Sequence, residues 1–363
     1  MSLTPDIIAR IDQHAAQAIA LLGQLVAIPS FSREEDKTAA LLFNYLRQNG
    51  VHPVRKKNNV WVFSDAYTKD RPTILLNSHH DTVKPTASWV LNPFTPLQKD
   101  GKLYGLGSND AGGPLVALLH TFLLMNAMKD REYNLVFAAT AEEEISGEKG
   151  IVITLPELNK IDLALVGEPT QMQMAVAEKG LMVIDATAKG VSGHAARNEG
   201  VNAIYIAMQD IEWLRTYRFP KKSEVLGEVN LAVTQISSGT QHNVVPDQCT
   251  FVIDVRTHEK YTNQEVFDIL QQHTQSELNA RSFRLNASGI PLDHPIVQRG
   301  QQLGMRYFGS PTLSDQALMQ GFPTLKIGPG DSARSHTADE FIFIDEIKQG
   351  ITQYVALLRG LKI

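Results

Sequence analysis

The segment 73-TILLNSHHDTV-83 decides how the chain is organised. Its first five residues form a short apolar run with the length of a buried strand. The run leads into Ser78-His79-His80-Asp81, so an imidazole and a carboxylate directly follow a buried element. A single His-x-Asp occurs often by chance, and a histidine at a strand end is usually only a hydrogen-bonded loop residue. The segment therefore indicates a metal site only if other strands end in a similar way.

Three later apolar runs also end in residues that bind metals in proteins. The runs and the residues that follow them are 133–139 with Glu142-Glu143-Glu144, 163–166 with Glu168, and 324–327 with His336. In addition, a glycine-rich turn that holds Asp110 precedes an apolar helix expected from about Pro114. Parallel strands place their carboxyl ends along one edge of a sheet, where open α/β folds have their sites. The sequence thus predicts an α/β fold with a mostly parallel sheet, flanked by helices, and a metal site at one edge.

Length and composition restrict the class of protein. A chain of 363 residues exceeds the usual size of one core, so two domains are expected. The net charge of −5, without a stripe of lysine and arginine, argues against nucleic acid as a partner. The single cysteine, Cys249, excludes an intramolecular disulfide and a cysteine-based zinc site. No run has membrane-spanning length and no secretion signal is evident, so we expect a cytoplasmic protein.

Residues 181–287 predict a complete small unit of the ferredoxin-like βαββαβ type. The expected elements are strand 181–188, helix 201–217, strand 229–236, strand 250–256, helix 263–278 and strand 281–287. Because His336 belongs with the earlier ligands, this unit interrupts the first domain. We therefore expect a catalytic domain formed by residues 1–178 and 289–363, with an inserted lid or dimerisation domain at 179–288.

The ligand-type residues at the strand ends suit a catalytic metal centre. They are His79, Asp110, Glu144, Glu168 and His336. Imidazole and carboxylate without thiolate fit zinc, and also cobalt, manganese or iron. Five ligands exceed the need of one zinc ion, but they suit two ions that share a bridging carboxylate. Two divalent ions are also balanced by three carboxylates and one hydroxide, so the cluster can be neutral and buried.

Two neighbouring acids have further possible roles. Asp81 is expected to orient His79 or another ligand from outside the metal shell. The run Glu142-Glu143-Glu144 has a simpler interpretation as a solvated acidic turn. At a sheet edge, however, three carboxylates repel one another unless a cation is present. Glu143 is then placed to take a proton from the attacking water and to pass it to the leaving nitrogen.

The sequence resembles the dinuclear zinc amidohydrolases and metallopeptidases that include acetylornithine deacetylase, succinyl-diaminopimelate desuccinylase, aminoacylase and glutamate carboxypeptidase. The resemblance covers nearly the whole chain and implies a zinc-peptidase-like catalytic domain. The stretches that carry it are 78-SHHDTV-83, 105-GLGSNDAGG-113, 140-TAEEEISG-147, 167-GEP-169, 192-SGH-194, 243-NVVP-246 and the segment from 328-GPG-330 to His336.

The resemblance implies a role for each matching residue. His79, Asp110 and Glu168 would bind one metal, and Asp110, Glu144 and His336 the other, with Glu143 as general base. His194, in the inserted domain of a homodimer, would stabilise the oxyanion in the partner's site. Arg256 would bind the substrate's carboxylate, although a surface ion pair is an equally good interpretation of that residue. Asn243 would also contact substrate.

Three positions depart from the family pattern: Lys84 separates Val83 from Pro85, no lysine follows Asp110, and Glu142 stands where many relatives have aspartate. None is a proposed ligand, but they weaken any transfer of substrate specificity.

The closest overall resemblance is to the acetylornithine deacetylase branch. We therefore expect hydrolysis of N-acetylornithine in arginine biosynthesis, with two zinc or cobalt ions and a small N-acyl amino acid as substrate. N-acetylcitrulline, an N-succinyl amino acid, or a di- or tripeptide are the alternatives, since Lys84, Lys179 or Arg334 could bind a negatively charged acyl group. A metal-binding protein without catalysis is disfavoured by the intact Glu143.

Overall fold

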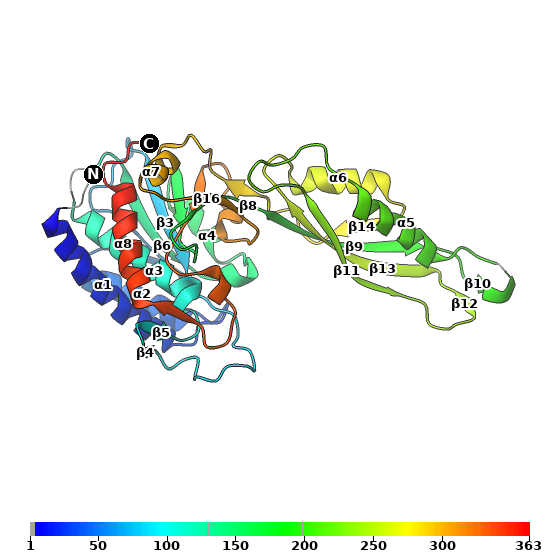
Figure 1. Ribbon diagram of the computed structural model, residues 1–363, viewed down its shortest axis with the longest axis horizontal. Coiled ribbons are helices and arrows are strands. Elements are labelled where there is room, and N and C mark those ends of the chain that lie inside the picture. Colours follow the sequence, from blue (N-terminus) through cyan, green and yellow to red (C-terminus); the bar gives the residue numbers. More distant parts are fainter. Residues whose placement is uncertain (1–3, 129–130, 198) are drawn as a thin grey trace. The chain divides into compact units, whose positions relative to one another are not determined.

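The computed structural model describes residues 4–128, 131–197 and 199–363. The chain forms two compact units, and both ends of the chain belong to the first (Figure 1). Unit 1 comprises Met1–Val176, Gly289–Phe308 and Ser314–Ile363, and unit 2 comprises Ala177–Ser288 and Gly309–Leu313.

The large sheet has the strand order β1-β2-β6-β3-β7-β17-β8-β15, with β16 paired to β8. Its strands are β1 Val54–Lys56, β2 Asn59–Phe63, β3 Thr73–His79, β6 Asn134–Thr140, β7 Leu163–Val166, β8 Met174–Glu178, β15 Ser288–Gly289, β16 Tyr307–Ser310 and β17 Thr324–Lys326. The central strands β6, β3, β7 and β17 are parallel neighbours. They are the four runs whose ends carry the predicted ligands, so the α/β fold expected from the sequence is confirmed.

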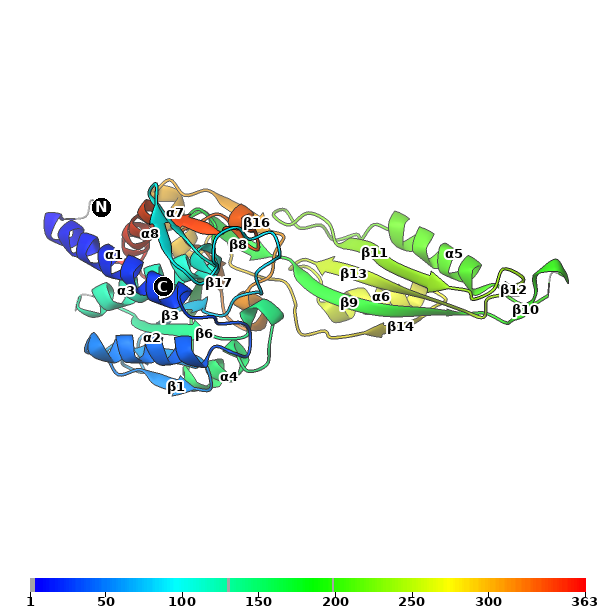
Figure 2. The ribbon, with the colours of Figure 1, turned by 90° about the horizontal axis from the view of Figure 1, so that it is seen from below.

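Helices cover both faces of this sheet. They are α1 Pro5–Val26, α2 Asp36–Gln48, α3 Gly113–Asn126, α4 Ile151–Thr154, α7 Pro295–Gln302 and α8 Ile344–Leu358. Figure 2 shows α1, α3 and α8 on one side of β3 and β6, and α2 and α4 on the other. Every residue of β3 is buried, which explains why its apolar residues 74–76 are consecutive instead of alternating with polar ones. α3 is buried from Gly113 to Met125, as its uniformly apolar sequence predicts.

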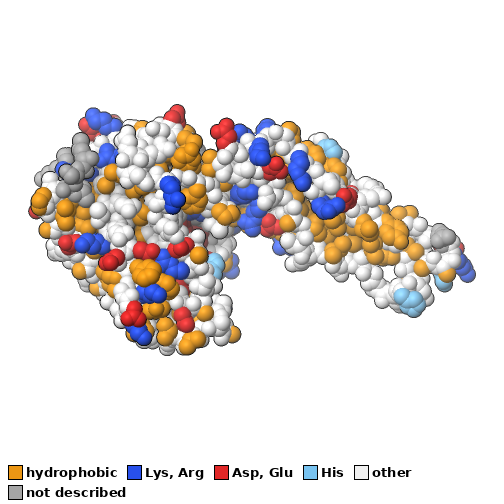
Figure 3. All heavy atoms as spheres, in the orientation of Figure 1, with side chains coloured by type: hydrophobic (Ala, Val, Ile, Leu, Met, Phe, Trp, Pro, Cys, Tyr) orange, Lys and Arg blue, Asp and Glu red, His pale blue; other side chains and the backbone are white. Residues whose placement is uncertain are grey.

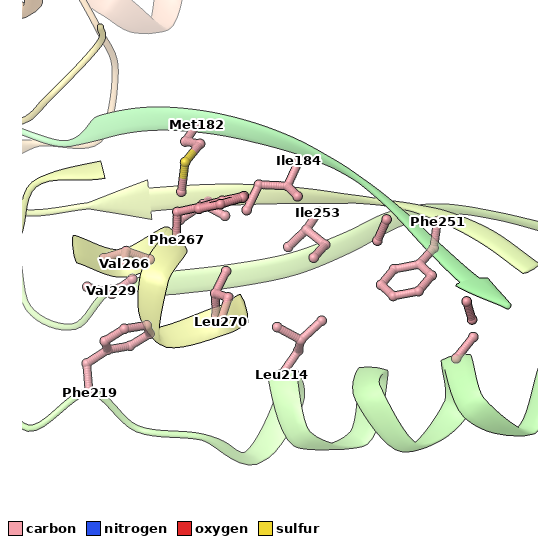
Figure 4. Packing of buried hydrophobic residues seen from close by; sticks show 14 of the residues in the cluster. Met182, Ile184, Leu214, Phe219, Val229, Phe251, Ile253, Val266, Phe267 and Leu270 are labelled. Carbon is pink, nitrogen blue, oxygen red and sulfur yellow. The ribbon is translucent and has the colours of Figure 1, made fainter. Parts of the chain in front are cut away.

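Unit 2 is built on an antiparallel sheet of order β11-β13-β9-β14. Its elements are β9 Gly180–Lys189, α5 Ala203–Thr216, β11 Asn230–Ser238, β13 Gln248–Thr257, α6 Asn263–His273 and β14 Glu277–Ala280. This is the βαββαβ order of a ferredoxin-like unit. Figure 4 shows Leu214 of α5 and Leu270 of α6 in one core with Ile253 of β13. Alternate residues of β9 are buried, because only one face of this sheet is covered by helices.

In unit 2, the last helix ends earlier than predicted, and the last strand begins earlier than predicted. The sequence suggests a helix over 263–278 and a strand over 281–287, but α6 ends at His273 and the strand spans Glu277–Ala280. Asp210 of α5 accepts hydrogen bonds from the backbone N–H groups of residues 275 and 276, which draws the chain out of the helix. The side-chain amide of Asn263 donates to backbone carbonyls within 281–287, so part of that segment's bonding capacity is used by a side chain.

Two small sheets complete the fold. β10 Gly193–His194 and β12 Val244–Val245 form a ribbon in unit 2, and β4 Leu97–Lys99, β5 Lys102–Tyr104 and β18 Phe341–Phe343 form a three-stranded antiparallel sheet in unit 1. Within the described ranges, no helix combines the length and the apolar character that crossing a membrane requires.

Candidate metal centre

Loops at the carboxyl edge of the large sheet carry most of the candidate ligands. His79 is the last residue of β3. Glu143 and Glu144 lie in a short helical turn after β6, and Glu168 follows β7. His336 lies in the loop that follows β17. The parallel order of these strands brings all five residues to one place, although they are spread over more than half of the chain.

Asp110 is held in the turn Ser108–Gly112, immediately before α3. The turn begins after Gly107, whose φ of 75° lies in the left-handed region that favours glycine. The buried carboxylate of Glu340 accepts hydrogen bonds from the backbone N–H groups of residues 107, 109 and 110, at 2.8 to 3.0 Å. These bonds fix the backbone that carries the Asp110 carboxylate.

The two oxygens of Asp110 face two different imidazoles. Its Oδ1 lies 3.3 Å from Nε2 of His79, and its Oδ2 lies 3.5 Å from Nε2 of His336. Each imidazole has a further carboxylate of its own. Glu168 Oε1 lies 3.7 Å from Nε2 of His79, and Glu144 Oε2 lies 3.0 Å from Nε2 of His336. Asp110 is thus in the position of a bridge between two groups of donors.

His79 presents an unused nitrogen to this cluster. Its Nδ1 bonds to the backbone carbonyl oxygen of Asp81 at 2.9 Å, which places the proton on Nδ1 and the lone pair on Nε2 of the neutral ring. The ring is 1% exposed, and among the described residues Nε2 has no hydrogen-bond partner. A buried lone pair that faces carboxylates, on a ring oriented by a carbonyl, is a suitable ligand for a divalent cation.

Asp81 positions the turn that carries Glu143 and Glu144. Its carboxylate accepts hydrogen bonds from the backbone N–H of Glu143 at 3.1 Å and of Glu144 at 3.2 Å. The hydroxyl of Ser32 donates a third bond to it at 2.7 Å. The Asp81 carboxylate is also 3.5 Å from Nδ1 of His79. The backbone carbonyl of Asp81 is closer to this nitrogen, at 2.9 Å. Asp81 therefore orients the imidazole and the acidic turn through different atoms.

Burial and mutual repulsion make this cluster costly without cations. Burial raises the pKa of Glu168 to about 8, and burial together with Glu168 and Glu144 raises the pKa of Glu143 well above its usual value. Burial alone would lower the pKa of His79, but the surrounding carboxylates, led by Glu143, raise it well above its usual value. The hydrogen bond with Glu144 raises the pKa of His336 to about 9. Divalent cations would supply the positive charge that bound protons otherwise provide.

The donor set fits two divalent cations. Two triplets of residues bring their ligand atoms close together: His79-Asp110-Glu144 and His79-Glu143-Glu168. Within each triplet, the three ligand atoms lie within 4.8 Å of one another. They overlap the ligand sets expected from the family, but Glu143 joins the second triplet and His336 is in neither. The pairwise distances still connect His336 with both Glu144 and Asp110. Imidazole and carboxylate donors of this kind suit zinc, cobalt, manganese or iron.

The other predicted site residues lie in unit 2. His194 is exposed in β10. The backbone N–H of Ala195, the next residue, donates a hydrogen bond to the backbone carbonyl of Asn243, so His194 and Asn243 belong to the same ribbon. Arg256 lies near the far end of β13, where it makes a bidentate pair with Asp254 at 2.8 and 3.1 Å. β13 leads away from the ribbon, and the eight steps from Gln248 to Arg256 span about 27 Å. Arg256 therefore lies at the end of the four-stranded sheet that is remote from the separate β10–β12 ribbon, which carries His194.

Sequence reasoning missed two buried acids beside the cluster, Glu340 and Asp315. Asp315 accepts a hydrogen bond from the hydroxyl of Thr140 at 2.6 Å, and burial raises its pKa to about 6. Neither acid lies in a recognisable motif. Thr140, the partner of Asp315, is 175 positions away in the chain, and Asp110, a partner of Glu340, is 230 positions away. No local pattern therefore reveals these contacts.

Two imidazoles and four carboxylates at the edge of a mostly parallel sheet are typical of hydrolases that use two divalent metal ions. The chain belongs to Peptidase family M20/M25/M40, whose family model matches residues 75–360. The resemblance seen in the sequence is thereby confirmed. The chain is a metal-dependent amidohydrolase or peptidase with a dinuclear centre.

Similar relatives cover almost the whole chain, and a solved structure shares its fold. Acetylornithine deacetylase of Proteus mirabilis is 29% identical over 376 residues, which cover 93% of this chain and 95% of that protein. Succinyl-diaminopimelate desuccinylase 2 of Ruegeria sp. is 25% identical over 380 residues, covering 96% and 95%. The structure of Bacillus subtilis YXEP, a dinuclear metal-binding peptidase of the M20 family, matches with a TM-score of 0.73 at 18% identity, covering 96% and 98%.

Proposed function

We propose that this hydrolase removes the acyl group from the nitrogen of an amino acid. The proposed reaction converts N-acetylornithine to ornithine and acetate, as a cytoplasmic step of arginine biosynthesis. The observation that carries the proposal is the similarity to an acetylornithine deacetylase over 93% of the chain. A peptidase that acts on the free amino terminus of a di- or tripeptide is the second candidate, because the family model describes peptidases.

The proposed chemistry assigns separate tasks to the residues of the cluster. One cation would be held by His79, Asp110 and Glu168, and the other by Asp110, Glu144 and His336, with zinc as the proposed ion. When bound, such ions polarise the scissile carbonyl and lower the pKa of water. Glu143 would accept the proton of the attacking water and deliver it to the leaving nitrogen. Arg256 would exchange its partner Asp254 for the substrate's carboxylate, and Asn243 would contact the substrate.

Of the three cations considered for a negatively charged acyl group, two are engaged. Arg334 pairs with Glu346 at 2.7 Å. The Lys179 ammonium donates to the side chain of Asn230 at 3.0 Å. Lys84 makes no ion pair among the described residues, and its ammonium lies 5.8 Å from the centre of the Phe31 ring. N-succinyl amino acids therefore remain the alternative substrates, with Lys84 as the proposed partner of the succinate carboxylate.

A panel of substrates tests the proposal. We expect kcat/KM for N-acetylornithine to exceed that for N-acetylcitrulline, N-succinylornithine, N-succinyl-diaminopimelate and a dipeptide by at least about tenfold, because one mismatched polar contact costs that much or more. Negligible turnover of N-acetylornithine beside efficient turnover of an N-succinyl substrate would reject the substrate and keep the amidohydrolase. A preference for the dipeptide would favour the peptidase.

We also propose a homodimer joined through unit 2, with His194 acting in the partner's site. Figure 3 shows hydrophobic side chains gathered on a face of unit 2. Tyr205 and Met208 of α5 are 65% and 57% exposed, and Ile236 of β11 is 56% exposed. β11 is also an edge strand, so its outer backbone groups are free to pair with a second copy. The separation of Arg256 from His194 within one chain supports a role for His194 across subunits.

Mixing two inactive variants tests this role. His194→Ala and Glu143→Gln each disable every site of a homodimer, but a mixed dimer contains one site with both intact groups. With full subunit exchange, about one quarter of all sites and of the wild-type activity should return. Mass spectrometry of the mixture verifies the exchange. Mixed dimers without recovered activity would show that His194 does not act across the interface.

A further inference from the structure

A cavity of about 180 Å³ lies next to the acidic turn Glu142-Glu143-Glu144 in unit 1. Its lining residues are Arg33, Lys57, Asn58, Ala141, Glu142 and Lys149. Three of these six residues are cations and one is an acid, so the lining has a positive formal charge at neutral pH. Glu142 also precedes Glu143 directly, so one wall of the cavity is the turn that reaches the metal cluster on its other side.

The three lining cations lack the partners that their basic neighbours have. Arg55 pairs with Asp36 at 2.5 Å, and Lys56 pairs with Glu157 at 2.6 Å. In the part of the chain that the structure describes, the side chains of the lining cations make no ion pair and no hydrogen bond. Like charges around one cavity repel one another, and an anion between them removes this cost.

The acids near the cavity keep their charge, but among the described residues they bond to backbone N–H groups and to an amide and make no ion pair with these cations. Glu35 Oε1 accepts the backbone N–H of Arg33 at 2.7 Å and that of Glu142 at 3.1 Å. Its Oε2 accepts the side-chain amide of Asn58 at 2.7 Å. Glu142 Oε2 accepts the backbone N–H of Lys149 at 3.2 Å. These bonds fix the backbone of the cavity wall and leave the cationic side chains free for a ligand.

Two of the cations stand at backbone positions that are unfavourable for them. Arg33 has φ of 78° and Lys57 has φ of 56°, in the left-handed region where glycine and asparagine are favoured. Long side chains in this conformation often mark functional positions.

We propose that this cavity binds a small polyanion with at least two negative charges, of the phosphate, diphosphate or tricarboxylate class. An arginine guanidinium forms paired hydrogen bonds to phosphate or carboxylate, and lysines add point charges. The volume equals that of about six water molecules, so it accommodates a diphosphate or a tricarboxylate as well as one phosphate. Binding at this site does not depend on which amide the enzyme cleaves.

Calorimetric titration of the full metal-loaded protein tests the proposal, with pyrophosphate, inorganic phosphate and citrate as probes. We expect one saturable site per chain. Lys57→Gln and Arg33→Gln should each weaken binding at least about fivefold, and the double variant should abolish measurable binding. Lys56→Gln is the matched control, since it removes an adjacent charge that already has a partner, and its affinity should equal that of the wild type. Tighter binding of pyrophosphate assigns the phosphate class, and tighter binding of citrate assigns the tricarboxylate class.

Phosphate and citrate also bind divalent metals, and the same variants separate that effect. Affinity that is unchanged in Lys57→Gln and Arg33→Gln would locate the anion elsewhere, most simply at the metal cluster, and would overturn the proposal. The absence of saturable binding for all three probes would overturn it as well. Thermal unfolding of each variant, without anion, verifies that the exposed substitutions leave the fold intact.

Discussion

Removal of divalent metal with a chelator is expected to lower amide hydrolysis by at least about a thousandfold, and zinc or cobalt is expected to restore it. Without metal, the described side chains of the cluster offer no strong nucleophile at neutral pH, and carboxylates cannot polarise a carbonyl. The buried lone pair of His79 Nε2 and the two-sided contacts of Asp110 indicate where the ions bind. Activity should be followed together with the metal content of the same sample.

The expected metal content gives this prediction a second readout. Restored enzyme should contain about two ions per chain, because Asp110 faces two separate groups of donors. Circular dichroism of the metal-free protein distinguishes lost chemistry from lost fold. Full activity in protein shown to be free of metal would end the two-metal proposal.

Glu143→Gln is expected to lower kcat by about a thousandfold and to leave both metal ions bound. The amide preserves the size and most contacts of the side chain but cannot accept a proton from water. Glu144→Gln should instead reduce the metal content, because Glu144 lies 3.0 Å from Nε2 of His336 and is a proposed ligand. Glu148→Gln, an exposed change in the same loop, is the control and should alter neither quantity.

The pair of variants is informative because the two glutamates are neighbours on one turn. Asp81 holds the backbone N–H groups of both, so either variant keeps the same support. Equal loss of metal from Glu143→Gln and Glu144→Gln would mean that the two roles are wrongly divided. That result would agree with the triplet in which Glu143 lies beside His79 and Glu168.

The sequence predicts the catalytic half of the fold well, because its signals are local. Buried parallel strands are short apolar runs, and the residues after them lie at one edge whatever the strand order is. His79, Glu144 and Glu168 could therefore be grouped before the order β6-β3-β7-β17 was known. His336 was grouped with them by the same reasoning, although a loop separates it from β17.

Contacts between distant segments could not be predicted in this way. Glu340 supports the Asp110 turn through backbone bonds that leave no pattern in the sequence. The end of α6 depends on Asp210, which is on another helix. By contrast, the pair of Arg256 with Asp254 follows from strand periodicity, because residues two apart lie on the same face. The ion-pair interpretation of Arg256 therefore had a structural basis in the sequence itself.

The place of β17 in the large sheet has a consequence for protein synthesis. β17 lies between β7 and β8, so the sheet of unit 1 is interrupted at its centre until residues 324–326 have left the ribosome. The sheet of unit 2 is complete once Ala280 has emerged. His336 is synthesised later still. A nascent chain therefore holds every other candidate ligand before it can form the donor group of Asp110, Glu144 and His336. That group is thus complete only in chains whose translation is nearly finished.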